Sequence, residues 1–188
     1  MDDVVFVRHG ESETAAAGVV GGDAPLTALG RDQARAVGRS LAERGFDLCF
    51  TSPARRARET AALVLERRDV AQADLPDLAD IEFGAFSGKP LHEYRSWIAA
   101  HDPAEAPPGG ESRVDTLRRF CRAYRALLGR VEAHLLVVAH GLTLSALTDD
   151  PPQPAVAGVP YGSSLELTRV ELAAAVARLE RWCEAPAW

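Results

Sequence analysis

Two short apolar segments, far apart in the chain, each end in a histidine followed by a glycine. Residues 4–7 run into Arg8 and His9, and residues 135–139 run into His140. Uninterrupted apolar, β-branched runs of this kind are typical of strands buried on both faces of a parallel sheet. Ligands of such sheets bind outside the carboxyl ends of the strands. The two histidines are therefore expected to meet at one edge of a sheet.

Helical patterns separate the predicted strands. We expect strands at 4–7, 46–50, 135–139 and 164–172, a short extended piece at 78–83, and helices at 27–44, 53–67, 91–100, 111–131 and 142–147. Thr27 and Ser52 are expected to cap two of the helices, with Gly45 just beyond the first one. The segment after Leu172 fits either a helix or a strand. This alternation predicts an α/β fold, a three-layer sandwich whose mostly parallel sheet carries helices on both faces.

Length and composition limit the kinds of protein that the chain can be. Its 188 residues fit a single domain, 1–188, and its net charge of −6 argues against a nucleic-acid or anionic-membrane partner. The three cysteines form no closely spaced pair, so we expect reduced thiols in a cytoplasmic protein, without a zinc site. The start of the chain lacks the basic region of a secretion signal, and no apolar run is long enough for a membrane span.

Arginines accompany the histidines at the predicted edge of the sheet. Arg8 precedes His9, and three arginines follow the second strand at positions 55, 56 and 58. The planar guanidinium matches phosphate oxygens and remains charged at any working pH. Histidine serves as a nucleophile or an acid–base group near neutrality. The set predicts a local cationic pocket for a phosphoryl dianion, although an isolated arginine or histidine at a strand end is more often a plain surface residue.

Five motifs occur in order along nearly the whole chain. They are Arg8-His9-Gly10-Glu11-Ser12, Pro25-Leu26-Thr27 with Gly30 and Gln33-Ala34, Thr51-Ser52-Pro53 with Arg56-Ala57 and Thr60-Ala61, Gly109-Gly110-Glu111-Ser112, and Val137-Val138-Ala139-His140-Gly141. In the residues of these motifs and in their order, the chain resembles the histidine phosphatase superfamily, in its phosphoglycerate-mutase-like branch. The resemblance implies a phosphoglycerate-mutase-like fold with a lid or insert at about 80–112.

The resemblance also implies roles for individual residues. His9 matches the nucleophile that becomes phosphohistidine, Arg8 and Arg56 match the arginines that clamp the phosphate, and His140 matches the second pocket histidine. Gly141 and Ser163 are expected to bind substrate as well, Ser163 through its backbone N–H. Because the arginines supply positive charge, no metal and no cofactor is expected. Where family members often carry an asparagine, this chain has Ala15.

Two carboxylate residues are candidates for the proton donor. Asp80 stands where the family usually has glutamate, and Glu82 lies two residues further on, on the same side of an extended segment. One such carboxyl group would protonate the leaving oxygen and later activate water. We favour Asp80, and keep Glu82 as the alternative.

The leading functional hypothesis is a metal-independent phosphatase that hydrolyses a small phosphorylated metabolite through phosphohistidine. The alternatives are a cofactor-dependent phosphoglycerate mutase, a protein phosphohistidine phosphatase and a catalytically silent phospholigand-binding module. We expect the mutases to be longer between the acid segment and the second histidine, and the small phosphohistidine phosphatases to lack most of the segment at 80–112. The particular phosphomonoester and the oligomeric state stay open, with a homodimer among the options.

Overall fold

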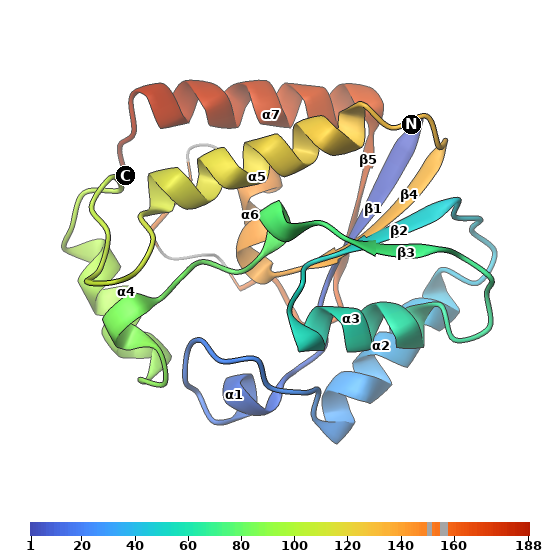
Figure 1. Cartoon of the computed structure of the whole chain (residues 1–188), viewed down its shortest axis with the longest axis horizontal. Coiled ribbons are helices and arrows are strands. Elements are labelled where there is room, and N and C mark those ends of the chain that lie inside the picture. The colour runs from blue at the N-terminus through green and yellow to red at the C-terminus, as the bar shows by residue number, and fades with distance from the viewer. Residues whose placement is uncertain (150–151, 155–157) are drawn as a thin grey trace.

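A five-stranded sheet with strand order β3-β2-β4-β1-β5 forms the centre of the computed structural model, which describes residues 1–149, 152–154 and 158–188 (Figure 1). The strands are β1 (Asp3–Arg8), β2 (Leu48–Thr51), β3 (Gln72–Asp74), β4 (His134–Ala139) and β5 (Ser164–Thr168). The pairs β1–β4, β4–β2 and β2–β3 are parallel, and β5 runs antiparallel to β1. The predicted α/β class with a mostly parallel sheet is confirmed.

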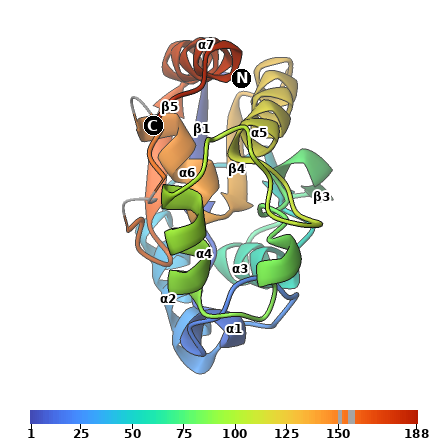
Figure 2. The same ribbon diagram turned by 90° about the vertical axis from the view of Figure 1, so that its left-hand side faces the viewer.

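Helices cover both faces of this sheet, which gives three layers (Figures 1 and 2). On one face lie α2 (Ala28–Ser40) and α3 (Arg55–Val64), and on the other lie α5 (Arg113–Leu128), α6 (Gly141–Thr148) and α7 (Arg169–Glu184). Successive side chains of β1 alternate between the layers: Val5 and Val7 pack in the core with α2 and α3, whereas Val4 and Phe6 pack in the core with α5, α6 and α7.

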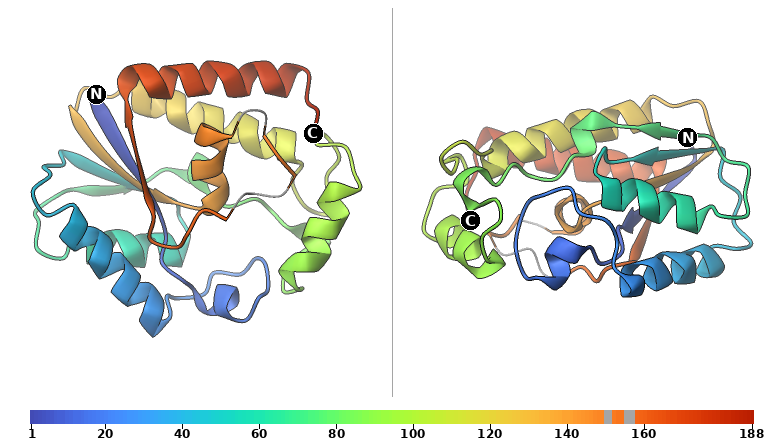
Figure 3. Two further views of the ribbon diagram at one scale, coloured as in Figure 1. Left: turned by 180° about the vertical axis from the view of Figure 1, so that it is seen from behind. Right: turned by 60° about the horizontal axis from the view of Figure 1, so that its bottom comes forward.

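The parallel pairing of β1 and β4 brings the two histidines together. Arg8 is in register with Ala139, so both strands end at the same level. The backbone N–H of His9 donates to the carbonyl of Ala139 at 2.9 Å, which continues the ladder by one residue. Beyond this edge lie the short helix α1 (Glu13–Ala16) and helix α4 (Leu91–Ala99) (Figure 3).

Two glycines allow the loop after β1 to pass against the start of α2. A Cβ atom at Gly10 would lie 2.3 Å from the carbonyl oxygen of Gly30, and one at Gly30 would lie 2.0 Å from that of Glu11. No side chain fits at such distances. Because Gly10 and Gly30 have no Cβ atom, the segment that follows His9 can pack closely against the start of α2.

Several helix ends differ from expectation. Helix α2 begins after its predicted cap Thr27 but ends at Ser40. Turns continue the chain, and the Arg68 guanidinium donates to the carbonyls of Leu41 and Arg44 there. Gly45 therefore does not end a helix. Helix α3 begins at Arg55 after Ala54, so Ser52 is not its cap. Helix α5 spans Arg113–Leu128, shorter than predicted, and is capped by Ser112.

Strand β3 was not predicted, and the extended piece expected at 78–83 is not a strand. The chain instead forms 3₁₀ turns at Pro76–Leu78 and Gly84–Phe86. Strand β5 ends at Thr168, where a capping box with Glu171 starts α7, so the ambiguous tail is a helix. None of the helices in the described ranges is long and apolar enough to cross a bilayer.

Candidate active site

His9 presents one ring nitrogen to the site and uses the other to hold its orientation. Its Nδ1 lies 2.7 Å from the carbonyl oxygen of Gly10. Since a carbonyl can only accept, Nδ1 carries the proton, and Nε2 keeps its lone pair. Burial holds the pKa of His9 well below its ordinary value of 6.5, and the nearby His140 and Arg56 lower it further. The ring is therefore neutral, as a nucleophile must be.

Arg56, from the first turn of α3, connects the parts of the site. Its buried guanidinium donates from Nε to Nε2 of His9 at 3.2 Å, and a terminal nitrogen lies 2.8 Å from a carboxylate oxygen of Asp80. The other terminal nitrogen donates to the carbonyl of Gly22 at 3.0 Å. These hydrogen bonds fix the guanidinium group next to the nucleophile.

His140 follows β4 and is held by a hydroxyl group. Its Nε2 lies 2.7 Å from Oγ of Ser52, and its Nδ1 lies 3.3 Å from the Asp80 carboxylate. With a proton on Nδ1, Ser52 donates to Nε2 and Nδ1 donates to the carboxylate; with the proton on Nε2, the ring donates to Ser52 and Nδ1 accepts from the Arg56 guanidinium, whose nitrogen also lies 3.3 Å away. Burial lowers the pKa of His140 to about 4, against the opposing effect of Asp80, so this ring is neutral as well.

Arg8, at the end of β1, lies over an aromatic ring. Its guanidinium carbon is 3.7 Å from the ring centroid of Tyr161, and one nitrogen donates to the carbonyl of Val159. A Cβ atom at Gly141 would lie 3.2 Å from Nε of Arg8, so the glycine leaves room for this side chain. Burial lowers the pKa of Arg8, an effect that Tyr161 opposes. An arginine nevertheless remains charged.

The two candidate carboxylates differ in their surroundings. Asp80 faces both Arg56 and His140, whereas Glu82 is exposed. Burial raises the pKa of Asp80, but His140 and Arg56 lower it by more, so that it lies below its ordinary value of 3.8. In the described part of the chain the Glu82 carboxylate has no ion-pair partner, although the residue lines a cavity of about 310 Å³ beside Asp80.

The backbone N–H of Ser163, which is predicted to bind substrate, has a partner within the chain. Its backbone N–H donates to the carbonyl of Pro160 at 3.1 Å, within the turn that precedes β5. A substrate would have to compete with this carbonyl for the N–H group. Ala15 lines a cavity of about 140 Å³ together with Arg8 and His9, where its methyl group offers no hydrogen bond.

Three positioning residues of the site were not predicted. Ser52 was taken for a helix cap, whereas it binds His140. Thr60 accepts a hydrogen bond from the backbone N–H of Gly10 at 3.0 Å and so holds the loop after the nucleophile. Tyr161 supports Arg8. Thr60 lies within one of the quoted motifs, and Tyr161 stands two residues before Ser163, but nothing in their spacing pointed to these contacts.

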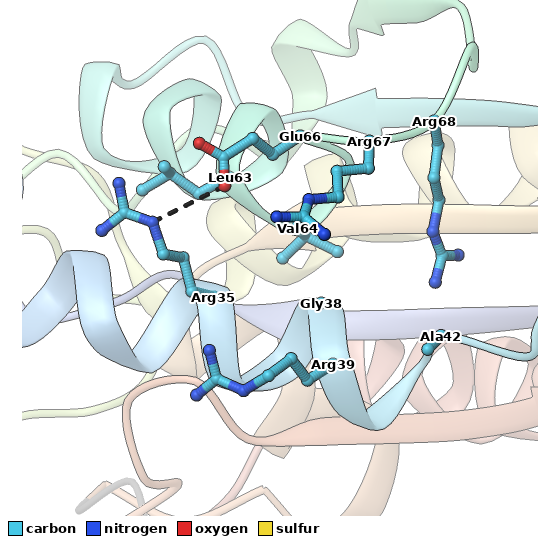
Figure 4. Close-up of a pocket in the computed structure, with 9 residues that line it drawn as sticks. All are labelled: Arg35, Gly38, Arg39, Ala42, Leu63, Val64, Glu66, Arg67 and Arg68. Carbon is cyan, nitrogen blue, oxygen red and sulfur yellow. Dashed lines mark ion pairs between the residues drawn. The ribbon is translucent and has the colours of Figure 1, made fainter.

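Asp80 lines three neighbouring cavities. The cavities of about 140 and 160 Å³ both reach Arg8 and His9, the cavity of about 310 Å³ adjoins Arg56, and Asp80 lines all three. A separate cavity of about 490 Å³ lies between α2 and α3, with Arg35, Arg39 and Arg67 around it and no residue of the site (Figure 4). Within the described ranges, no three His, Cys, Asp or Glu side chains are grouped as a metal site would need.

An α/β sheet that presents two neutral histidines and two arginines at the carboxyl ends of its strands defines a class of site suited to a phosphate group. The family model described as the histidine phosphatase superfamily (branch 1) matches residues 4–184, and the chain belongs to this superfamily.

Relatives within the family have more than one activity. The chain is 39% identical to a 2,3-bisphosphoglycerate-dependent phosphoglycerate mutase of Methylobacterium sp. (strain 4-46), over 77% of each chain. It is 36% identical to an adenosylcobalamin/alpha-ribazole phosphatase of Salmonella typhimurium, over 76% of this chain and 75% of the relative.

Solved structures with the same fold include two phosphatases. A mycobacterial glucosyl-3-phosphoglycerate phosphatase in complex with VO3 gives a TM-score of 0.75 at 28% identity, over 89% of this chain and 92% of the other. The alpha-ribazole phosphatase from Shigella flexneri gives a TM-score of 0.73 at 27% identity, over 87% and 89% of the two chains.

Proposed function

We propose that the chain is a metal-independent phosphatase, which hydrolyses a small phosphomonoester through a phosphohistidine at His9. The observation that carries this proposal is the state of the His9 ring. It is neutral, its proton is held on Nδ1 by the Gly10 carbonyl, and its Nε2 lies beside a buried arginine. An unprotonated nitrogen next to a fixed cation can attack phosphorus while the charge on the phosphate is neutralised.

In the first step, Nε2 of His9 forms a bond to phosphorus as the bond to the leaving oxygen breaks. Arg8, Arg56 and the Nδ1–H of His140 neutralise the phosphate oxygens during the transfer. The phosphate takes the donors of Arg56 and His140 from Asp80, which loses the contacts that lower its pKa. Asp80 then takes up a proton from solvent water and gives it to the leaving oxygen.

In the second step, water attacks the phosphohistidine. The Asp80 carboxylate, ionised after the first step, removes a proton from this water. The nitrogen–phosphorus bond breaks, His9 returns to its neutral form and inorganic phosphate leaves. The exposed cavity next to Asp80 supports this step, because water can reach the carboxylate through it.

A phosphoglycerate mutase is the second candidate. The 39% identity to the Methylobacterium mutase favours it. A mutase must keep the phosphoryl group on histidine until the substrate has turned, so it must exclude water, whereas cavities open around Asp80 here. We therefore favour a phosphatase over a mutase.

The test is a panel of phosphomonoesters with EDTA present, measured as release of inorganic phosphate. Hydrolysis is expected for the native chain and for His134→Ala, which changes an exposed histidine at the far end of β4, and not for His9→Ala. Activity that survives in His9→Ala, or that appears only with added metal, would overturn the mechanism. Interconversion of 2- and 3-phosphoglycerate, primed by 2,3-bisphosphoglycerate and faster than hydrolysis, would favour the mutase.

A further inference from the structure

The segment that carries Asp80 has no regular secondary structure to hold it. Residues 79–83 lie between two 3₁₀ turns and belong to no helix or strand. Leu78 and Ile81 are buried in the core, but apolar contacts have no direction and do not set where a carboxylate points. The orientation of the Asp80 side chain must therefore come from hydrogen bonds to the segment.

Arg119, on α5, supplies these hydrogen bonds. One terminal nitrogen of its guanidinium donates to the carbonyls of Asp77 and Ala79 at 2.9 and 2.8 Å, and the other donates to the carbonyl of Asp80 at 3.2 Å. Its Nε and the second terminal nitrogen also bind the carboxylate of Glu111, at 3.0 and 2.6 Å. All five N–H donors of this guanidinium thus have an acceptor within the chain.

Glu111 orients the arginine and holds the far end of the same segment. Its carboxylate accepts both hydrogen bonds of a bidentate pair with Arg119, and its backbone N–H donates to the carbonyl of Glu82 at 2.9 Å. The side chains of Arg119 and Glu111 are only 15% and 17% exposed. A bidentate pair that is shielded from water keeps the guanidinium in one orientation. Glu111 belongs to the motif at 109–112, to which the proposed mechanism gives no part.

Arg119 acts on Asp80 through the main chain. In the described ranges the carboxylate of Asp80 pairs with Arg56 and His140, whereas Arg119 binds the carbonyl of the same residue. An aspartate side chain is short, so a displacement of the main chain moves the carboxylate with it. The contact with Arg56 at 2.8 Å therefore depends on where Arg119 holds the segment.

We infer that Arg119, oriented by Glu111, is a positioning residue for the proton transfers that Asp80 carries out. The inference rests on the proposed function and adds a residue to its acid–base step. Proton transfer to the leaving oxygen requires a carboxyl group within hydrogen-bond distance. A displacement of about 1 Å can lower a rate by about 100-fold, so a loosely held segment would make Asp80 a poor acid.

Two phosphate esters with different leaving groups measure this proton transfer. The nitrophenolate of 4-nitrophenyl phosphate leaves with little need of a proton, whereas the more basic phenolate of phenyl phosphate needs one. Arg119→Lys keeps the positive charge but has three donors and no planar fork. In this variant, kcat/KM for phenyl phosphate is expected to fall about 10-fold more than kcat/KM for 4-nitrophenyl phosphate. A residue that only stabilised the fold would lower both values equally.

Arg122→Gln is the matched control. Arg122 lies on the same helix and binds the side chain of Asp77, in the same segment, but it is exposed. Its removal should leave the ratio of the two kcat/KM values as in the native chain. In a chain that carries Asp80→Asn, adding Arg119→Lys should not change the ratio further, because the positioned carboxylate is gone. A native ratio in Arg119→Lys, or an equal change with and without Asp80, would overturn the inference.

Glu111→Gln provides a second variant if Arg119→Lys fails to fold. It preserves the size of the side chain and removes the charge of the pair. The ratio must then shift in the same direction for the inference to stand, and a native ratio in a folded Glu111→Gln chain would contradict it.

Binding of inorganic phosphate tests the position of Asp80 without turnover. Phosphate competes with this carboxylate for Arg56, so a displaced carboxylate should let phosphate bind more tightly. Titration calorimetry is expected to show about 3- to 10-fold tighter binding in Arg119→Lys and native affinity in Arg122→Gln. If the native chain hydrolyses neither ester nor any of the panel, the phosphatase is refuted, and this shift would still support the positioning by Arg119. Equal affinities of the native chain and Arg119→Lys would overturn the inference.

Discussion

A carboxylate oxygen of Asp80 lies 2.8 Å from a guanidinium nitrogen of Arg56, in a site that also holds the unprotonated nitrogen of His9. A phosphate dianion requires the same guanidinium, so it must compete with the carboxylate for it. In the proposed mechanism this competition has a use, since the displaced carboxylate gains a proton just where the leaving oxygen needs one.

Replacing Asp80 separates its effect on turnover from its effect on binding. In Asp80→Asn, kcat is expected to fall about 10²- to 10⁴-fold, because the proton donor is lost. Inhibition by inorganic phosphate should hold or become stronger, because the amide competes less well for Arg56. Steady-state kinetics with phosphate as a product inhibitor measures both.

Glu82→Gln is the matched control for this variant. It removes a carboxylate of the same segment that has no ion-pair partner in the described structure, and kcat should change little. A larger loss in Glu82→Gln than in Asp80→Asn would reverse the assignment, and equal small losses would mean that neither group is the acid.

Much of this site follows from sequence, and the reasons for the exceptions are physical. The strands that end in His9 and His140 are buried on both faces, so their apolar composition marks them clearly. Strand β3 consists of three exposed residues at the edge of the sheet, and its composition carries no such signal. Its pairing with β2 depends on tertiary contact alone.

Side-chain partners were harder to predict than strands. The Ser52-Pro53 sequence is a good helix start by local rules, but the hydroxyl is used by a histidine 88 residues away. An arginine at the first position of a helix is usually solvated, and sequence alone does not show that Arg113 is buried in a cavity shared with the candidate nucleophile. Both depend on distant segments meeting.

Removing the Ser52 hydroxyl should affect both activity and stability. In Ser52→Ala, Nε2 of the buried His140 loses its donor, and the ring can adopt the other tautomer. We expect the free energy of unfolding to fall by about 1–3 kcal/mol and kcat/KM to fall about tenfold. Urea titration and initial rates measure the two effects. Ser40→Ala, which removes a hydroxyl bonded within α2, is the control, and an equal effect there would contradict the role of Ser52.

Stability should decrease as the pH falls below 6.5. His140 has a folded-state pKa of about 4, so between pH 6.5 and 4 the unfolded chain binds a proton there that the folded chain does not. The free energy of unfolding therefore decreases by about 1.4 kcal/mol per pH unit for this residue, and His9 acts in the same direction.

Urea titrations at several pH values between 7 and 4.5 check this dependence. The slope should be smaller in His140→Asn, which cannot take up the proton, and unchanged in His92→Asn, where the histidine is exposed. A native chain with the same stability at pH 7 and pH 4.5 would show that these imidazoles are not held neutral.

The close approach of two glycines predicts a steric effect on the whole site. In Gly10→Ala the new methyl group would lie 2.3 Å from the Gly30 carbonyl, which must move. We expect a loss of about 1–3 kcal/mol in stability together with lower activity, because the moved loop follows His9. In Gly129→Ala, at the end of α5, the nearest atom is 3.5 Å away, and thermal melting should change little. Equal melting temperatures of the two variants would contradict the close packing of Gly10 against Gly30.

The most direct test of the central claim is detection of a phosphoryl group on His9. The chain is mixed with a phosphomonoester labelled in its phosphoryl group, stopped within milliseconds to seconds in alkali, and analysed by peptide mass spectrometry. The account predicts a phosphoryl group that is stable in alkali, labile in acid and located on His9, and that is absent in His9→Ala. Rapid hydrolysis by the native chain with no labelled peptide at any time, or with the label on another residue, would contradict it.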